Sequence, residues 1–271
     1  MTWPVPDEIL ERPHRMLGRN IWRYNELEST NSLALELGTQ LDTRPGWHGL
    51  ALLADRQTHG RGQHERVWEA PGGLGLLMSV LLDPPTACRR PAILTSWMAV
   101  SVARVVEEII GGPVAIKWPN DVLVNGRKIA GILVEQRRGT VVGVGLNVLQ
   151  TADHFAALKL PTATSLACLV THPPGVALVA EQLLDAMDLD WGDLERGEGG
   201  GVERRWRDGL GLLHDILSLD GLAAPCSAAL QTLLKPRAIC GYPAFFHHSR
   251  EIHTCIIQTH HRGCLPPIFS F

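Results

Sequence analysis

The sequence Lys117–Trp118–Pro119–Asn120–Asp121 follows the short apolar run Val114–Ala115–Ile116 and is the most informative segment for the fold of this chain. Because proline cannot donate to a β-ladder, the run predicts a strand that stops at Lys117 and gives way to a polar loop. Reactive side chains gather at such loops in α/β proteins. Lys117 offers a compact cation for a carboxylate or phosphate, while Asn120 and Asp121 offer oxygens that can accept from a ligand or hold Mg²⁺. The stretch therefore indicates a nucleotide-using enzyme.

Three antiparallel strands are predicted directly after this stretch. Asn125–Gly126 is the strongest short signal for a hairpin, since both residues tolerate the positive φ angles of a two-residue turn. Gly143 and Gly145 interrupt the last strand, where a missing side chain lets another group lie close to the backbone. The predicted strands cover residues 122–124, 129–135 and 141–148.

The rest of the chain to about residue 210 supplies further strands and helices. Apolar runs predict strands at 21–24, 50–54 and 74–82. Apolar residues at steps of three and four predict core helices over 92–110 and 176–194. A loop at 161–175, a glycine linker at 198–201 and a short helical piece around Trp206 complete this part. These elements predict an α/β (α+β) fold with a mixed, largely antiparallel sheet flanked by helices.

Two polar segments upstream each have a structural and a functional interpretation. Ser29, Thr30 and Asn31 can simply cap the helix predicted to follow them and end at a glycine, or they can face a ligand as a cluster of donors and acceptors. Gly60–Arg61–Gly62 can be a solvated turn, or a loop whose backbone N–H groups and guanidinium hold an anion. Trp68, just beyond that loop, can stack on an adenine or anchor the loop to the core.

Composition argues against several function classes. The net charge of −3 gives no general attraction to nucleic acid or to anionic membranes. The N-terminus lacks the basic and apolar regions of an export signal, and no apolar run reaches the roughly 18 residues of a membrane helix. We therefore expect a cytoplasmic protein without a membrane partner. Its six cysteines then argue little for disulfides, because that compartment is reducing.

Six motifs follow one another along residues 20–210: Ser29–Thr30–Asn31, Asp55–Arg56–Gln57, Gly60–Arg61–Gly62 with Trp68, Lys117 to Asp121, Arg127 to Glu135, and Gly143 to Val148. In this order they resemble the biotin protein ligase family, whose members activate biotin with ATP and attach it to a lysine of a carrier domain. Lipoate ligases of related fold lack the combination of Gly–Arg–Gly with Lys–Trp–Pro–Asn–Asp. The resemblance implies a shape shared with class II aminoacyl-tRNA synthetases. Without a DNA-binding module before residue 20, we expect the monofunctional type, with no DNA partner.

The resemblance also implies roles for individual residues. Lys117 would touch the biotin carboxylate and the α-phosphate of ATP, with Arg61 as a second catalytic residue, because this reaction needs positioned cations. Mg²⁺ would accompany ATP, with Asp121 as its expected ligand. Biotin contacts are expected from Ser29, Thr30, Asn31, Gln57, Gly60, Arg61, Gly62, Lys117 and Gly131. Nucleotide contacts are expected from Arg61, Gln63, Trp68, Asn120 and Asn147.

Two features depart from the family. Most members have arginine directly after Gly–Arg–Gly, where this chain has Gln63, and a neutral amide holds a phosphate less strongly than a guanidinium does. The usual C-terminal β-barrel is also missing, so we expect a catalytic domain over 1–212 and an atypical, poorly ordered segment over 213–271, such as a shifted reading frame would give. That segment holds four of the six cysteines and six of the twelve histidines, which leaves a metal module as the alternative. Their spacing matches no zinc pattern.

The expected partners are biotin, ATP and the biotin carboxyl carrier domain of a biotin-dependent carboxylase. No charge pattern singles out a dimer surface, so a homodimer stays open. Two rival functions remain. One is an acyl ligase or acyltransferase of the same fold that acts on lipoate or octanoate. The other is a biotin-binding protein without turnover, which would release no pyrophosphate from ATP.

Overall fold

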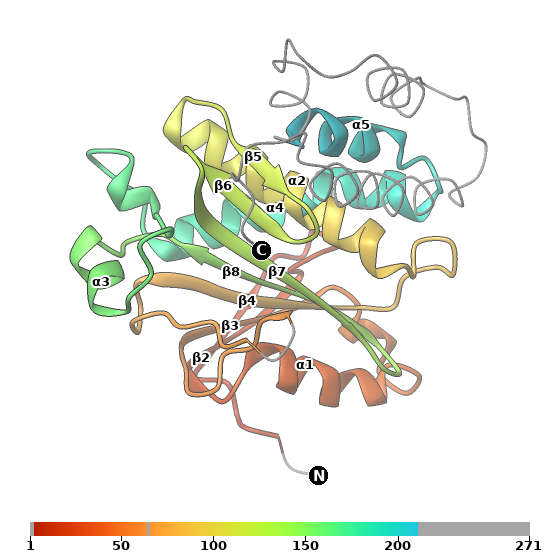
Figure 1. The fold of residues 1–271 in the computed structure, drawn as a ribbon. Helices are drawn as coiled ribbons and strands as arrows, with labels where there is room; N and C mark the ends of the chain where they lie inside the picture. The colour runs from red at the N-terminus through yellow and green to blue at the C-terminus, as the bar shows by residue number, and fades with distance from the viewer. Residues whose placement is uncertain (1–2, 64–65, 211–271) are drawn as a thin grey trace, which may run out of the picture. The chain divides into compact units, whose positions relative to one another are not determined.

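The computed structural model describes residues 3–63 and 66–210, and these contain an eight-stranded sheet with the order β1-β2-β3-β4-β8-β7-β6-β5 (Figure 1). Strands β2 and β3 pair in parallel, and the other neighbouring pairs are antiparallel. The predicted mixed, largely antiparallel sheet is therefore confirmed. The strands are β1 (Glu8–Glu11), β2 (Asn20–Leu27), β3 (Leu50–Gln57), β4 (Gly75–Leu82), β5 (Ala115–Lys117), β6 (Asp121–Val124), β7 (Arg127–Gln136) and β8 (Thr140–Asn147).

Helices cover both faces of the sheet. Figure 1 shows α1 on one face, with α2 and α4 on the other. Between α2 and α4 the indole rings of Trp97 and Trp191 lie 5.0 Å apart, and both side chains are fully buried. The helices are α1 (Thr30–Leu37), α2 (Pro91–Ile110), α3 (Ala152–Ala157), α4 (Val176–Glu195) and α5 (Gly200–Gly209), with 3₁₀ turns at Gly38–Gln40, Pro45–Trp47 and Leu166–Cys168.

The local signals in the sequence explain where the main elements begin and end. Ser29 caps α1, since its side chain accepts from the backbone N–H of Ser32. Gly111 ends α2 in the left-handed conformation that glycine adopts without steric cost. Asn125 and Gly126 both have positive φ angles, of 50° and 73°, and form the turn between β6 and β7.

Three predicted or omitted elements need correction. The glycine linker at 198–201 is wrong in part, because α5 begins at Gly200 and buries Val202 and Trp206 on one side. Strand β1 and helix α3 were not expected, since four exposed residues and a six-residue helix carry no apolar period. The predictions for residues 213–271 lie outside the described residues. Within residues 3–63 and 66–210, no helix is long and apolar enough to cross a membrane.

His48 makes the stability of this fold depend on pH. Its Nδ1 accepts from the backbone N–H of Asp83 at 3.0 Å, and its ring lies 5.8 Å from Trp191. Burial lowers the pKa of His48, although Glu195 and Asp83 oppose this effect. Between the lowered pKa of the folded chain and the ordinary pKa of about 6.5, His48 is protonated more in the unfolded chain than in the folded one. The free energy of unfolding should therefore fall as the pH drops below about 6.5 towards the folded pKa.

We expect the free energy of unfolding in urea to fall by at most about 1.4 kcal/mol per pH unit over that window because of this one group. His48→Asn, which keeps an acceptor near Nδ1, should lose this component when pH 7.5 is compared with pH 5.5. His172→Asn, at an exposed histidine, should keep the wild-type dependence. Equal pH dependence in wild type and His48→Asn would contradict the assignment.

Candidate functional site

The candidate site follows one row of register partners across the sheet. The row runs from Lys117 to Asp121, Gly131 and Gly145, and continues into β4 at Leu77. Register partners point to the same side of a sheet, so the row forms one continuous strip. The motif that ends β5 is therefore brought next to the glycines of β7 and β8, which are distant in sequence.

Trp68 lies flat on the glycine part of this row. A Cβ atom on Gly145 would lie 2.3 Å from Cε2 of Trp68, and one on Gly131 would lie 2.9 Å from its Cζ3. Such distances are sterically impossible, so the indole can rest here only because both residues are glycine. This contact fits the anchoring interpretation for Trp68, and stacking of the indole on an adenine stays a prediction. Nε1 of Trp68 is buried and has no hydrogen-bond partner among residues 3–63 and 66–210.

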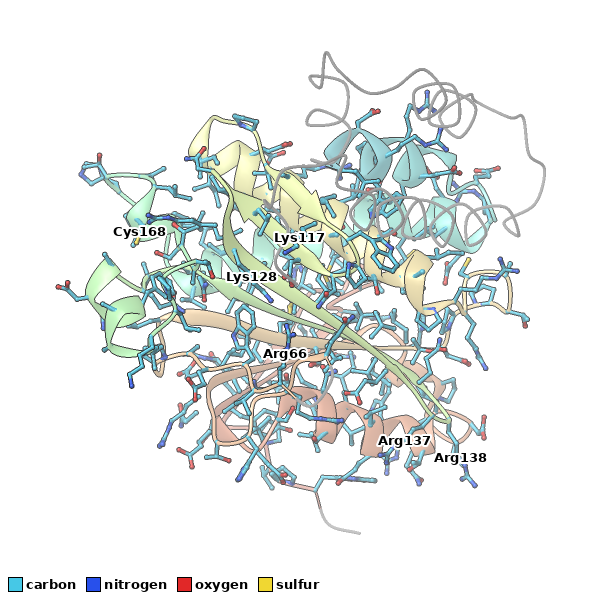
Figure 2. The ribbon with its side chains drawn as sticks, viewed as in Figure 1. Arg66, Lys117, Lys128, Arg137, Arg138 and Cys168 are labelled. Atoms are coloured by element: carbon cyan, nitrogen blue, oxygen red, sulfur yellow. The ribbon has the colours of Figure 1, made fainter. Side chains whose placement is uncertain are left out.

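Lys128 places a cation beside Trp68. Its Nζ lies 2.6 Å from Oδ1 of Asp121 and 5.5 Å from the centroid of the Trp68 ring. This ammonium group therefore links Asp121, the first residue of β6, to the indole of Trp68. Figure 2 shows Lys117 and Lys128 close to each other over the sheet, whereas Arg137 and Arg138 lie at the far tip of the β7–β8 hairpin.

A second row of register partners lies two residues along the strands from the first, beneath the side chain of Asn31. Ser79 on β4, Gly143 on β8 and Leu133 on β7 are register partners, and Asn31 lies over them. Its Oδ1 is 2.6 Å from the Ser79 hydroxyl, and its Nδ2 donates to Oε2 of Glu135 at 3.0 Å. Asn31 is only 4% exposed, and both ends of its buried amide have partners, as buried polar groups require.

Thr30 and Gln57 extend this polar cluster towards β3. The side-chain oxygen of Gln57 accepts from the backbone N–H of Thr30 at 2.7 Å and from its hydroxyl at 3.0 Å. The Thr30 hydroxyl also lies 2.7 Å from that of Ser79. The structure thus brings together the predicted residues Ser29, Thr30, Asn31 and Gln57, and Ser29 also serves as the helix cap. Both interpretations of this segment fit the same geometry.

The glycine-containing loop lies across the same face. Gly60 and Trp68 are joined by a backbone hydrogen bond, as are Gly62 and Arg66. A Cβ atom on Gly60 would lie 2.2 Å from the carbonyl oxygen of Trp68, so only glycine fits there. Arg61 extends from the loop to Glu135, with 2.8 Å between its Nη2 and Oε1.

The remaining predicted residues differ in whether their side chains already have partners within the described residues. Lys117 is exposed at the end of β5, and its ammonium group has no ion pair with any residue in the described ranges. Asn120 donates to the carbonyl of Ile132 at 3.1 Å. Asn147 is buried, with its amide bound to Thr164 and Gln150, so those atoms already hold the end of β8. Its contact with a nucleotide stays a prediction.

The described residues do not by themselves form a metal site. No group of three or more His, Cys, Asp or Glu residues in the described part of the chain is arranged to hold a metal ion. Asp121 is already paired with Lys128. A divalent cation would therefore have to arrive with a ligand that supplies most of its oxygens.

Three important residues of the site were not predicted. Ser79 is the single hydroxyl in the otherwise apolar strand β4, a signal that can be found in the sequence. Glu135 and Lys128 belong to a quoted motif but carry no pattern that distinguishes them from surface charges. Their importance depends on which residues face each other across β6, β7 and the loop, and a linear pattern cannot show this.

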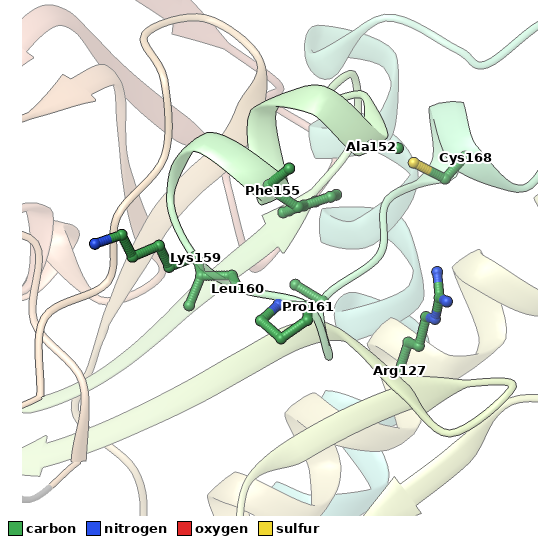
Figure 3. A pocket seen from close by; sticks show the side chains of 9 residues that line it. Arg127, Ala152, Phe155, Lys159, Leu160, Pro161 and Cys168 are labelled. Atoms are coloured by element: carbon green, nitrogen blue, oxygen red, sulfur yellow. The ribbon is translucent and has the colours of Figure 1, made fainter.

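A cavity of about 430 Å³ lies elsewhere, between α3 and the turn that follows it (Figure 3). None of the predicted site residues lines it. Figure 3 shows the side chain of Lys159 pointing away from the other labelled residues. The lining residues are Arg127, Ala152, Phe155, Ala156, Lys159, Leu160, Pro161, Ala163 and Cys168.

Comparison with known proteins gives a consistent family. The model of the biotin/lipoate A/B protein ligase family matches residues 27–150. The biotin–[acetyl-CoA-carboxylase] ligase of Mycobacterium tuberculosis is 38% identical over 198 residues, which cover 69% of this chain and 73% of that protein. The bifunctional ligase/repressor BirA of Bacillus subtilis is 37% identical over 157 residues, which cover 56% of this chain and 47% of BirA. The chain thus spans about half the length of that relative.

Solved structures agree with this comparison. The structure of biotin protein ligase from Aquifex aeolicus in complex with biotin and ATP superposes with a TM-score of 0.60 at 27% identity, covering 70% of this chain and 78% of that chain. The chain belongs to the biotin protein ligase family.

Proposed function

We propose that the protein is an ATP-dependent biotin protein ligase, which forms biotinyl-5′-AMP and then transfers biotin to a lysine of a carrier domain. One observation carries the proposal: a buried polar cluster at the start of α1 lies next to the glycine strip that leads to Lys117. The polar cluster suits a small polar ring, and the strip that ends at the Lys117 ammonium group suits an anion. The names of the relatives from Mycobacterium tuberculosis and Aquifex aeolicus support it.

The ring would bind at Ser29, Thr30, Asn31 and Gln57, together with Ser79. A ureido group has two N–H donors and one carbonyl acceptor, so it needs both kinds of partner in a protein. Buried hydroxyl and amide groups provide them without a charge, and Ser29, Thr30 and Asn31 are each less than 5% exposed. Polar groups held this firmly lose little freedom when a ligand replaces one of their partners.

The chemistry would take place along the strip that ends at Lys117. An oxygen of the biotin carboxylate attacks the α-phosphorus of ATP. A new O–P bond forms, the bond between the α-phosphorus and the oxygen bridging to the β-phosphate breaks, and pyrophosphate leaves. Lys117 and Arg61 would offset the negative charge that builds up on the phosphate oxygens. The amine of the carrier lysine then attacks the carbonyl of this mixed anhydride, so that an amide forms and AMP leaves. This second step needs only correct positioning, because the acyl group is already activated.

Mg²⁺, bound to the ATP phosphates, would neutralise charge on the leaving pyrophosphate. Asp121, whose Oδ1 is paired with Lys128, would contact it through its other carboxylate oxygen. The net charge of −3 supports a function without a DNA partner. A homodimer and a cytoplasmic location stay predictions.

The test is the transfer of biotin by the full chain to a carrier domain in the presence of ATP and Mg²⁺. The mass of the carrier domain is then measured by mass spectrometry. Addition of one biotin to the carrier, dependent on ATP, is expected. Parallel reactions with lipoate and octanoate should give no addition. Modification by lipoate or octanoate alone would favour the rival acyl ligase. Biotin binding without pyrophosphate release would favour the binding protein.

Gln63 gives a separate prediction about retention of the intermediate. A guanidinium at this position should add a charge-assisted hydrogen bond to the adenylate phosphate, so Gln63→Arg should slow adenylate release about tenfold. Release is measured by chasing labelled biotinyl-5′-AMP from the enzyme. Gln136→Arg, which adds the same charge at the end of β7, should release at the wild-type rate. An unchanged rate in Gln63→Arg would show that Arg66 or another group already does this work.

A further inference from the structure

Glu135 joins the two halves of the candidate site. Its Oε1 lies 2.8 Å from Nη2 of Arg61, and its Oε2 accepts from Nδ2 of Asn31 at 3.0 Å. We propose that Glu135 is a positioning residue for adenylate formation, which sets Arg61 for the phosphate and Asn31 for the ring with one carboxylate. This inference rests on the proposed function.

The Asn31 end of this contact decides which way a buried amide faces. Asn31 lies against Gly143, where a Cβ atom would come within 2.0 Å of its Oδ1. Ser79 occupies the oxygen side, while Glu135 and the carbonyl of Leu133 occupy the nitrogen side. A carboxylate and a backbone carbonyl accept but cannot donate, so Glu135 at 3.0 Å and the more distant carbonyl of Leu133 at 3.4 Å together keep the NH₂ group of Asn31 pointed towards β7. The hydroxyl of Ser79 can either donate or accept, so it cannot fix this orientation alone.

The Arg61 end restricts a long and flexible cation. The side chain of Arg61 is 42% exposed and that of Glu135 is 20% exposed, so the pair lies at the boundary between solvent and site. A guanidinium has five N–H donors, and the contact with Glu135 leaves most of them for an anion. Holding Arg61 beforehand reduces the rotamer entropy that is lost when the phosphate binds.

An opposite effect of Glu135 is also physically reasonable. A carboxylate beside an anion site repels the substrate phosphate, so its removal could strengthen ATP binding. The two effects have opposite signs in experiment. If Glu135 acts by positioning, neutralising it slows adenylate formation. If it acts by repulsion, neutralising it accelerates the reaction or lowers the KM for ATP.

The experiment is a double-mutant cycle on the full chain, using single-turnover formation of biotinyl-5′-AMP. Glu135→Gln keeps an acceptor for Asn31 but removes the charge that holds Arg61, and we expect a rate about tenfold lower. In the Arg61→Gln background the same change should cost less than about twofold, because its partner is already absent. Glu28→Gln, at an exposed carboxylate near the site, should change neither background. A wild-type or faster rate for Glu135→Gln, or fully additive losses, would overturn the proposal.

A readout without turnover separates this proposal from the proposed function. In the ligand-free protein, the side-chain NH₂ resonances of Asn31 should shift in Glu135→Ala and stay in place in Glu28→Ala. If wild type forms no adenylate but the resonances shift, the proposed function fails while the contact stands. If wild type forms adenylate and neither the rate nor the resonances change, the role of Glu135 fails alone.

Discussion

Lys117→Met is expected to form biotinyl-5′-AMP about 10²–10³-fold more slowly than wild type, which is the usual cost of removing one donor that stabilises a transition state. The physical reason is the position of Lys117, exposed at the end of β5 on the row that holds Asp121, Gly131 and Gly145. Methionine keeps the length of the side chain and removes its charge. The rate is measured in a single turnover with saturating biotin and ATP.

The control for Lys117→Met is Lys159→Met, at an exposed lysine that follows α3. It removes the same charge from the chain, and it should keep the wild-type rate. Because Lys117 is exposed, its replacement should leave the thermal midpoint nearly unchanged. A loss of less than tenfold in Lys117→Met would show that another cation supports the α-phosphate.

Gly143→Ala should have the second largest effect, because its methyl group would occupy the place of Asn31. A Cβ atom there would lie 2.0 Å from Oδ1 and 2.8 Å from Cγ of Asn31, which is buried and cannot simply turn into solvent. Displaced, Asn31 would lose its contacts with Ser79 and Glu135. We expect biotin to bind about 100-fold more weakly, which corresponds to about 2.7 kcal/mol. Titration calorimetry with biotin measures this change.

Two further glycine variants serve as controls for Gly143→Ala. Gly46→Ala adds a methyl group with no atom within 4 Å and should bind biotin like wild type. Gly145→Ala meets Trp68 and not Asn31, so it should impair the nucleotide step more than biotin binding. Wild-type biotin affinity in Gly143→Ala would contradict the assignment of Asn31 to the ring subsite.

The sequence predicted most of the sheet and both long helices, because their signals are local. Apolar periodicity identified α2 and α4, and Asn125–Gly126 identified the turn between β6 and β7. Strand β1 was missed, since its four exposed residues leave no buried face to detect. Helix α5 was placed too late, because the apolar contacts of Val202 and Trp206 outweigh the low helix propensity of the two glycines at its start.

For the site, the sequence identified the residues of the motifs but not how they face each other. The neighbours of Lys117 in its row come from the register of β6, β7 and β8, which no single segment encodes. Trp68 resting on Gly131 and Gly145 is a contact between a loop and two strands. Glu135 carries no sequence signal of its own, because its meaning depends on Arg61 and Asn31 reaching the same carboxylate.

Isotope exchange between pyrophosphate and ATP, catalysed by the full chain with Mg²⁺, tests whether the protein activates biotin as an adenylate. This exchange reports reversible adenylate formation and needs no carrier domain. We expect label to enter ATP when biotin is present, and not with lipoate, octanoate or no acid. Exchange that does not depend on biotin, or no exchange although biotin binds, would contradict the proposed biotin ligase activity.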